Sequence, residues 1–69
     1  MEWIDGQSSN IARFAYDEDR EVLIVEFNSG ATYEYFDITQ NVFESMKAAS
    51  SRGGFLAHEI KGRYRYARA

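Results

Sequence analysis

The chain has no cysteine and only one histidine among its 69 residues. The missing cysteine excludes disulfide bonds and thiolate metal sites, the usual supports of small secreted domains. No apolar run approaches the roughly 20 residues of a transmembrane helix, and the acidic N-terminus lacks the basic start of a signal peptide. We therefore expect a soluble, cytoplasmic protein without membrane contact.

Basic residues are scarce in the first 44 positions, where two arginines face ten acidic residues and the net charge is −8. From Ser45 onward, six basic residues face Glu59 alone, and the net charge is +5. The chain ends in a segment of interleaved basic and aromatic residues, Lys61-Gly62-Arg63-Tyr64-Arg65-Tyr66-Ala67-Arg68. Such a segment suits phosphate contact with base stacking, and it equally suits an ordinary edge strand.

The length predicts one domain that covers residues 1–69. A chain of this size buries only about 60% of its unfolded surface, so we expect a stability of about a few kcal/mol. Eleven aromatic residues must supply much of the core. Self-association is one way for so small a domain to gain stability.

Three segments, 10–16, 21–27 and 31–36, have the alternation and composition of β-strands. In the first, Ala12, Phe14 and Tyr16 share one predicted face, and the other face is formed by Ile11, Arg13 and Ala15. Turns are predicted at 17–20 and at 28–30, where Gly30 is free to adopt a positive φ. Short connections of this kind make an antiparallel meander. Residues 1–9 form a lead-in whose Trp3 and Ile4 are apolar enough to dock on the sheet.

The sequence period then changes to that of a helix, capped by Asp37 or Thr39 and running to about Ser50. Its expected buried face comprises Val42, Phe43, Met46 and Ala49. A glycine of the following loop is available for a left-handed cap. A short second helix is expected over 55–61, with Leu56 and Ile60 on one side, and Gly62 ends it.

Residues 63–68 are expected to be extended or to form a fourth strand. The predicted fold class is α+β. It is a three-stranded antiparallel meander packed by one main helix, followed by a short second helix and an extended C-terminal segment.

Catalytic chemistry finds little support in the sequence. His58 has no cysteine and no convergent ligand set, so a structural histidine is favoured over a catalytic or metal-binding one. The carboxylates fall mostly at a predicted turn and on outward strand positions, and the Asp17-Glu18-Asp19 run lacks the later ligands of a calcium loop. We expect no catalytic residues, no metal and no cofactor.

The loop over 50–54 is a candidate anion site. Ser50, Ser51, Gly53 and Gly54 offer hydroxyls and backbone N–H groups beside the guanidinium of Arg52. A helix C-cap followed by a turn is the favoured alternative for the same residues.

The C-terminal segment is a candidate nucleic-acid surface. In an extended conformation Arg63 and Arg65 project to one side, and Tyr64, Tyr66 and Arg68 project to the other. Core or edge packing is the commoner fate of such tyrosines. The acidic half of the chain opposes phosphate binding unless the two charges lie on different faces.

Ordered motifs span residues from about 8 to 66. They are Ser8-Ser9-Asn10-Ile11, Tyr16-Asp17, Leu23-Ile24-Val25-Glu26-Phe27, Ser29-Gly30, Tyr33-Glu34-Tyr35, Ile38, the run from Ala48 to Phe55, Ile60-Lys61 and Tyr64. The set resembles the KTSC domain, a small domain found at the C-terminus of some lysyl-tRNA synthetases and as a stand-alone protein. The chain differs in having Thr39 in place of a frequent helix-starting proline and in a Ser-Arg-Gly-Gly loop longer by one residue.

The resemblance implies a small α+β domain that is not an enzyme, and its synthetase context implies RNA binding or protein docking. The family's Ser-rich, Gly-Phe and Ile-Lys positions fall on Ser50, Gly54, Phe55, Ile60 and Lys61. Our leading hypothesis is a binding module that contacts nucleic acid, preferably RNA, through a basic surface. Its expected contact residues are Arg52, Lys61, Arg63, Tyr64, Arg65, Tyr66 and Arg68. The alternative is a protein-interaction module, including a homodimer that pairs edge strands or opposite charges.

Overall fold

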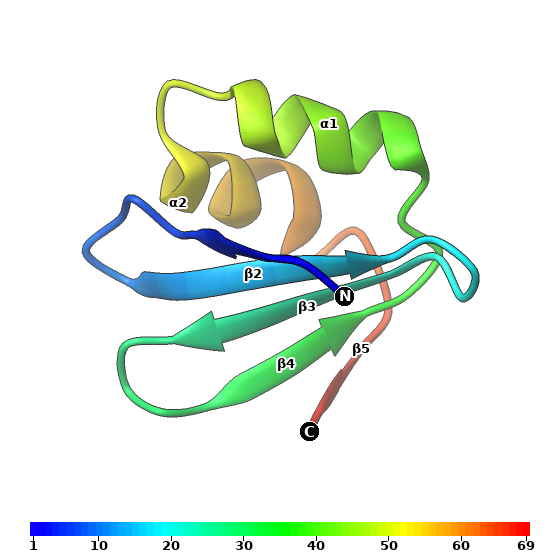
Figure 1. Cartoon of the computed structure of the whole chain (residues 1–69), viewed down its shortest axis with the longest axis horizontal. Coiled ribbons are helices and arrows are strands. Elements are labelled where there is room, and N and C mark those ends of the chain that lie inside the picture. Colours follow the sequence, from blue (N-terminus) through cyan, green and yellow to red (C-terminus); the bar gives the residue numbers. More distant parts are fainter.

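A five-stranded antiparallel sheet, with two helical segments on one face, forms the whole molecule (Figure 1). The computed structural model describes all 69 residues. The spatial order of the strands is β1-β2-β3-β4-β5, the same as their order in the chain. The strands are β1 (Trp3–Asp5), β2 (Ile11–Asp17), β3 (Val22–Phe27), β4 (Thr32–Tyr35) and β5 (Tyr66–Arg68). The first helical segment is α1 (Gln40–Ala48), and the second consists of α2 (Arg52–Phe55) and η1 (Leu56–Ile60), which continues it without a break.

The predicted meander is confirmed in β2, β3 and β4. Leu23 lies opposite Tyr16 on one side and Tyr35 on the other, so the three side chains share a face of the sheet. The two hairpin turns fall where the sequence predicts them, and Gly30 has a φ of 96°. That backbone conformation is strained for any residue with a Cβ atom.

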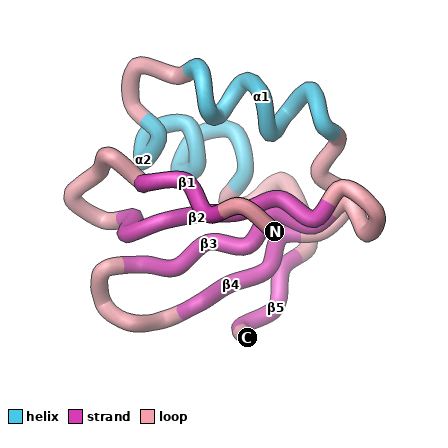
Figure 2. The backbone as a smooth tube through the Cα atoms, viewed as in Figure 1, coloured by secondary structure: helices cyan, strands magenta, loops and turns pink.

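The predicted number of strands was wrong, because two edge strands complete the sheet. β1 pairs with β2, and β5 pairs with β4, each in antiparallel register. Both strands have three residues, which is too few for alternation to show in the sequence. Backbone pairing with a longer neighbour, rather than side-chain pattern, holds them in the sheet (Figure 2).

A β-bulge changes the predicted faces of β2. Ile11 pairs with Phe27 and Arg13 pairs with Glu26, which leaves Ala12 as an extra residue. The extra residue turns Ile11 to the same face as Phe14, and both are buried. The prediction that Ile11 shares a face with Arg13 is therefore wrong.

The main helix α1 is capped by Thr39, whose hydroxyl accepts a hydrogen bond from the Val42 N–H at 3.4 Å. Asp37 has a φ of 60° and lies outside the helix. Of its predicted buried face, Phe43 and Met46 are buried, whereas Val42 and Ala49 are only half-buried. The helix ends at Ala48, earlier than predicted, and the residue after it, Ala49, is extended instead of left-handed.

The second helical segment begins at Arg52, three residues before its predicted start. Gly53 and Gly54 lie inside it and have no positive φ, so the predicted glycine cap of the first helix is wrong. Glycine is needed at position 53 because the side chain of Ser8 lies close to its backbone. A Cβ atom at this position would lie 2.6 Å from the Ser8 Oγ. The segment ends in a wide π-helical turn, in which the Lys61 N–H donates to the Leu56 carbonyl at 2.8 Å.

The core lies between the helices and the central strands β2, β3 and β4. Ten buried residues form it: Ile11, Phe14, Leu23, Val25, Tyr35, Ile38, Phe43, Met46, Leu56 and Ile60. In Figure 1, β4 and β5 extend away from the helical layer, and the opposite sheet face has no helix on it. No helix has the length and apolar character needed to cross a membrane.

Candidate nucleic-acid interface

An open hollow lies on the helix-bearing face of the sheet, over β4 and β5 where no helix covers it. Alternation along β4 places Tyr33 and Tyr35 on this face, opposite Arg68 and Tyr66 of β5. The hollow has a volume of about 720 Å³. We call it the aromatic hollow; it is lined by Phe27, Ser29, Ala31, Tyr33, Tyr35, Lys61, Gly62, Tyr66 and Arg68.

The rings in the aromatic hollow form a contiguous cluster. The centroid of Tyr66 lies 5.7 Å from that of Tyr33 and 6.1 Å from that of Tyr35, at tilts of 40°. Phe27 meets Tyr33 edge to face at 5.7 Å. Tyr35 is 3% exposed and forms the floor, whereas Tyr66 is 62% exposed. Tyr66 therefore offers ring surface to a ligand, and Tyr35 supports it.

Burial raises the pKa of Tyr35 above its usual value of 10.0, and the neighbouring Tyr33 and Tyr66 raise it further. The Tyr35 hydroxyl therefore stays protonated at neutral pH.

Lys61 and Arg68 are the charged residues of the aromatic hollow, and no carboxylate lines it. The π-helical turn ends at Lys61, and Gly62 follows with a φ of 80°. This backbone holds the Lys61 Nζ 5.1 Å from the centroid of the Phe27 ring. Neither Lys61 nor Arg68 belongs to an ion pair of the structure, which comprises five pairs elsewhere.

Arg63 and Arg65 line a second, shallower hollow next to the first. We call it the shallow hollow; it is lined by Phe36, Gly62, Arg63, Tyr64, Arg65 and Tyr66. Arg65 pairs with Asp37 at 3.4 Å and lies 5.2 Å above the Phe36 ring. Arg63 is exposed and has no ion pair. Tyr64 is half-buried against the core, so of the two candidate tyrosines only Tyr66 is open to a ligand.

Arg52 lies apart from both hollows and makes internal contacts. Its guanidinium donates to the Asp5 carbonyl at 2.8 Å and to the Lys47 carbonyl at 3.0 Å. The group also lies 5.6 Å above the Phe14 ring, and its buried Nε has no partner. Arg52 thus joins β1, α1 and α2, and we leave it out of the interface.

The structure accounts for the 50–54 loop by capping and packing. The Ser51 Oγ accepts from the Gly54 N–H at 3.0 Å, which begins α2. Gly53 contacts Ser8, as described above, and Ser50 is exposed between the helices. The predicted anion-binding role has no further contact to support it.

Sequence reasoning missed Tyr33, Tyr35 and Phe27 as site residues. The alternation around Glu34 places Tyr33 and Tyr35 on one face, but alternation alone does not say that this end of the face is uncovered. The missing information was the pairing of β4 with β5, which brings Tyr66 and Arg68 beside them.

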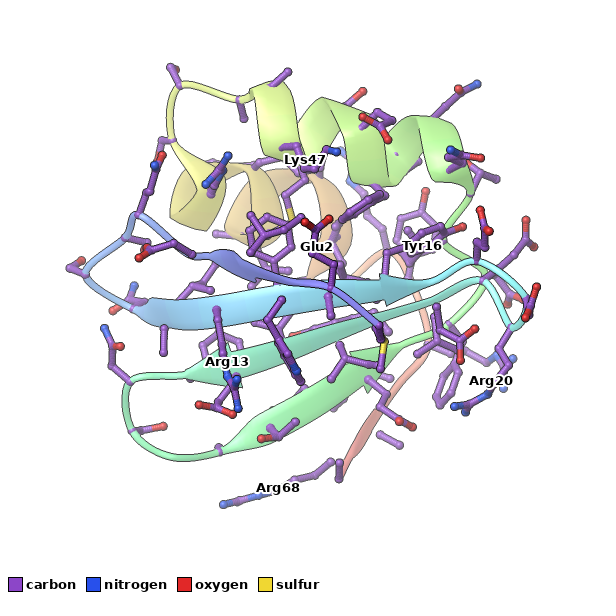
Figure 3. The ribbon with its side chains drawn as sticks, viewed as in Figure 1. Glu2, Arg13, Tyr16, Arg20, Lys47 and Arg68 are labelled. Atoms are coloured by element: carbon purple, nitrogen blue, oxygen red, sulfur yellow. The ribbon has the colours of Figure 1, made fainter.

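The acidic residues lie away from the aromatic hollow. Glu26 and Glu34 point to the open sheet face, where Arg13 pairs with Glu26 at 3.1 Å and Arg20 reaches Glu34 at 3.9 Å. Arg13 also covers Trp3, with the guanidinium carbon 4.1 Å from the ring centroid. Figure 3 shows Tyr16 reaching toward α1 and Arg13 on the side away from the helices. The carboxylates of Glu26 and Glu34 on the open sheet face are thus paired with arginines of the same face.

The sheet, the helical layer and the hollow define a small α+β domain with one uncovered sheet end. The family model described as the KTSC domain matches residues 7–64, and the chain belongs to that family. A crystal structure of a KTSC domain protein from Yersinia pestis is similar, with a TM-score of 0.92 and 26% identity over 99% of this chain and 96% of that one. The resemblance found in the sequence is thereby confirmed.

Relatives include both large and small proteins. A lysine–tRNA ligase from Nostoc punctiforme is 35% identical over 60 residues, which are 87% of this chain and 11% of the ligase. A small protein from Tsukamurella paurometabola is 37% identical over 59 residues, 86% of this chain and 88% of that protein. The chain therefore spans about a tenth of the ligase relatives it matches and most of the small one.

Proposed function

We propose that this protein is a non-enzymatic binding module that contacts RNA through the aromatic hollow. One observation carries the proposal: the exposed Tyr66 ring, backed by Tyr33 and Tyr35, lies beside Lys61 and Arg68, two cations without ion-pair partners. Aromatic rings stack on bases and cations contact phosphates, which is the chemistry of sequence-tolerant nucleic-acid binding. The proposed site is smaller than the basic surface expected from sequence, because Arg52 makes internal contacts and the charge of Arg65 is paired with Asp37.

The charge distribution supports this proposal. The net charge of −3 disfavours phosphate binding, but the carboxylates Glu26 and Glu34 lie on the opposite face of the sheet. The similarity to a segment of lysine–tRNA ligases favours RNA over DNA as the partner.

The test is a salt titration of a labelled short RNA with the protein and with the Lys61→Ala, Arg68→Ala double variant. We expect the affinity of the wild type to fall with salt, because phosphate contacts release counterions. The double variant should reduce the slope of log affinity against log salt by about 1.4, at about 0.7 per lost contact on single strands. Arg20→Ala, which removes a cation on the opposite face, is the matched control. Absence of wild-type binding at low salt contradicts the proposal.

Protein interaction is the alternative proposal, and the observation that favours it is the pair of exposed edge strands. β1 and β5 each present an outer edge to which another chain can add a strand. Sedimentation at two salt concentrations tests self-association, and a monomer at both rules out pairing through opposite charges. We place either function in the cytoplasm.

A further inference from the structure

Tyr66 forms a ridge between the two hollows, and this position carries an inference about the form of the ligand. Tyr66 and Gly62 line both the aromatic hollow and the shallow hollow. One side of the Tyr66 ring meets Tyr33 and Tyr35, and 62% of the residue remains exposed. A ligand that extends from one hollow into the other can therefore pass over the boundary formed by Gly62 and Tyr66, where Tyr66 offers the exposed ring.

Resting on the proposed function, we infer that the ligand is an unpaired strand that crosses Tyr66, with a base stacked on that ring. A base in a duplex has both faces covered by its neighbours, so its ring surface is closed to a tyrosine. A duplex would have to bind through its phosphates, and the aromatic hollow offers two cations for that purpose. An unpaired strand uses the exposed ring as well.

The free cations on either side of Tyr66 define the path of the strand. Lys61 and Arg68 lie in the aromatic hollow, and Arg63 lies in the shallow hollow. Arg65 shares the shallow hollow, but its charge is paired with Asp37 at 3.4 Å. Three phosphate contacts on a single strand give a log–log salt slope of about −2, at about 0.7 per contact.

The experiment compares fluorescence anisotropy titrations of two labelled probes, octauridylate and a blunt RNA duplex of eight base pairs, against the full chain. Octauridylate has no stable self-pairing, so its bases are free to stack. We expect octauridylate to bind at least about fivefold more tightly than the duplex at equal salt, since a stacked base contributes about 1–3 kcal/mol.

Variants separate stacking from charge. Tyr66→Ala should weaken octauridylate binding roughly 5- to 100-fold, whereas Tyr66→Phe, which keeps the ring, should stay within about twofold. Arg63→Ala should reduce the magnitude of the salt slope by about 0.7. Arg20→Ala, on the other face of the sheet, should change neither quantity. Because Tyr66 is exposed at the edge of the sheet, we expect Tyr66→Ala to stay folded. Tyr66→Phe shows whether binding needs the ring or the hydroxyl.

The outcomes distinguish this inference from the proposed function. Equal or tighter binding of the duplex overturns the unpaired strand while leaving RNA binding in place. Unchanged octauridylate binding by Tyr66→Ala overturns the crossing at Tyr66 in the same way. An unchanged salt slope in Arg63→Ala overturns the path into the shallow hollow. Failure of both probes to bind at low salt overturns the proposed function and the inference together.

Discussion

Aromatic and basic side chains have opposite environments at the two ends of the helix-bearing sheet face. At the covered end, Tyr16 stacks on Phe43 of α1 at 4.7 Å, and Phe14 meets the same ring edge-on at 6.2 Å. At the open end, Tyr33, Tyr35 and Tyr66 pack against one another, and Tyr66 remains largely exposed because no helix covers it. Aromatic residues on one face are thus core or surface according to where the helical layer stops.

Arginine shows the same contrast. At the covered end, Arg52 holds two backbone carbonyls and lies over Phe14. At the open end, Arg68 has no ion pair and projects past the strands in Figure 3. Basic residues that lie close together in a sequence therefore do not all contribute to a basic surface, because some of them make contacts inside the fold.

The largest expected difference in stability is between the variants Phe14→Ala and Tyr66→Ala. Phe14 has no exposed surface, so its truncation should lower the free energy of unfolding by about 3–5 kcal/mol, enough to unfold most of so small a domain. Tyr66→Ala should cost less than about 1 kcal/mol, because its ring is mostly exposed. Urea denaturation followed by circular dichroism measures both.

Since Phe14→Ala is expected to unfold most of the protein, Phe14→Leu provides a second value, with an expected loss in the free energy of unfolding of about 1 kcal/mol. Equal losses for Phe14→Ala and Tyr66→Ala would show that the open end carries as much of the stability as the covered end, and would remove the contrast.

A smaller difference in stability is expected between variants of Arg52 and Arg68. Arg52→Ala removes two charged hydrogen bonds and should lower the free energy of unfolding by about 2–3 kcal/mol. Arg68→Ala should stay within about 0.5 kcal/mol of the wild type. Thermal denaturation of both variants under one buffer checks this. Arg52→Lys should not restore the loss, because one ammonium lacks the planar fork that reaches both carbonyls; full restoration would mean that charge alone matters.

The smallest expected effect is in the pH dependence of stability. Burial raises the pKa of Tyr16 and of Tyr35 in the fold, whereas both titrate near 10.0 in the unfolded chain. Their contribution to stability is therefore complete below about pH 10 and is lost as the pH rises through the folded values. Tyr16 also loses the hydrogen bond that it donates to the Ile38 carbonyl at 2.6 Å.

Denaturant midpoints measured from pH 7 to 11 test this effect at each end of the face. The midpoint should stay level up to about pH 9 and then fall. Tyr16→Phe should reduce the fall at the covered end, and Tyr35→Phe should reduce it at the open end. If the midpoint of each variant falls as much as that of the wild type, groups other than Tyr16 and Tyr35 cause the loss of stability at alkaline pH.

Much of the fold follows from the sequence. Alternation predicts β2, β3 and β4, turn residues predict both hairpins, and the i, i+4 pair of Leu56 and Ile60 predicts the buried side of the second helical segment. Of the two edge strands, β5 lies in the segment 63–68, for which the sequence leaves a fourth strand and an extended tail as alternatives, whereas β1 is not predicted. Pairing with a neighbour, not their own pattern, makes both of them strands. The bulge at Ala12 escapes because nothing local marks the extra residue.

The site is less predictable than the fold. Lys61, Tyr66 and Arg68 come from the predicted basic segment, but their neighbours Tyr33 and Tyr35 lie 26 residues or more away in the chain. Arg52 looks like the other arginines in sequence, and only its contacts with Asp5 and Lys47 reveal an internal role. Long-range pairing therefore decides which members of the segment act together.

The positions of the two chain ends have a practical consequence for any fusion. The N-terminus leads into β1 and the C-terminus leaves β5, at opposite edges of the sheet. Ala69 is tied to Thr32 by a 2.8 Å hydrogen bond, next to Arg68 and the aromatic hollow. A purification tag or partner domain attached after Ala69 would start at the rim of the hollow and obstruct it. One attached before Met1 would leave the hollow open.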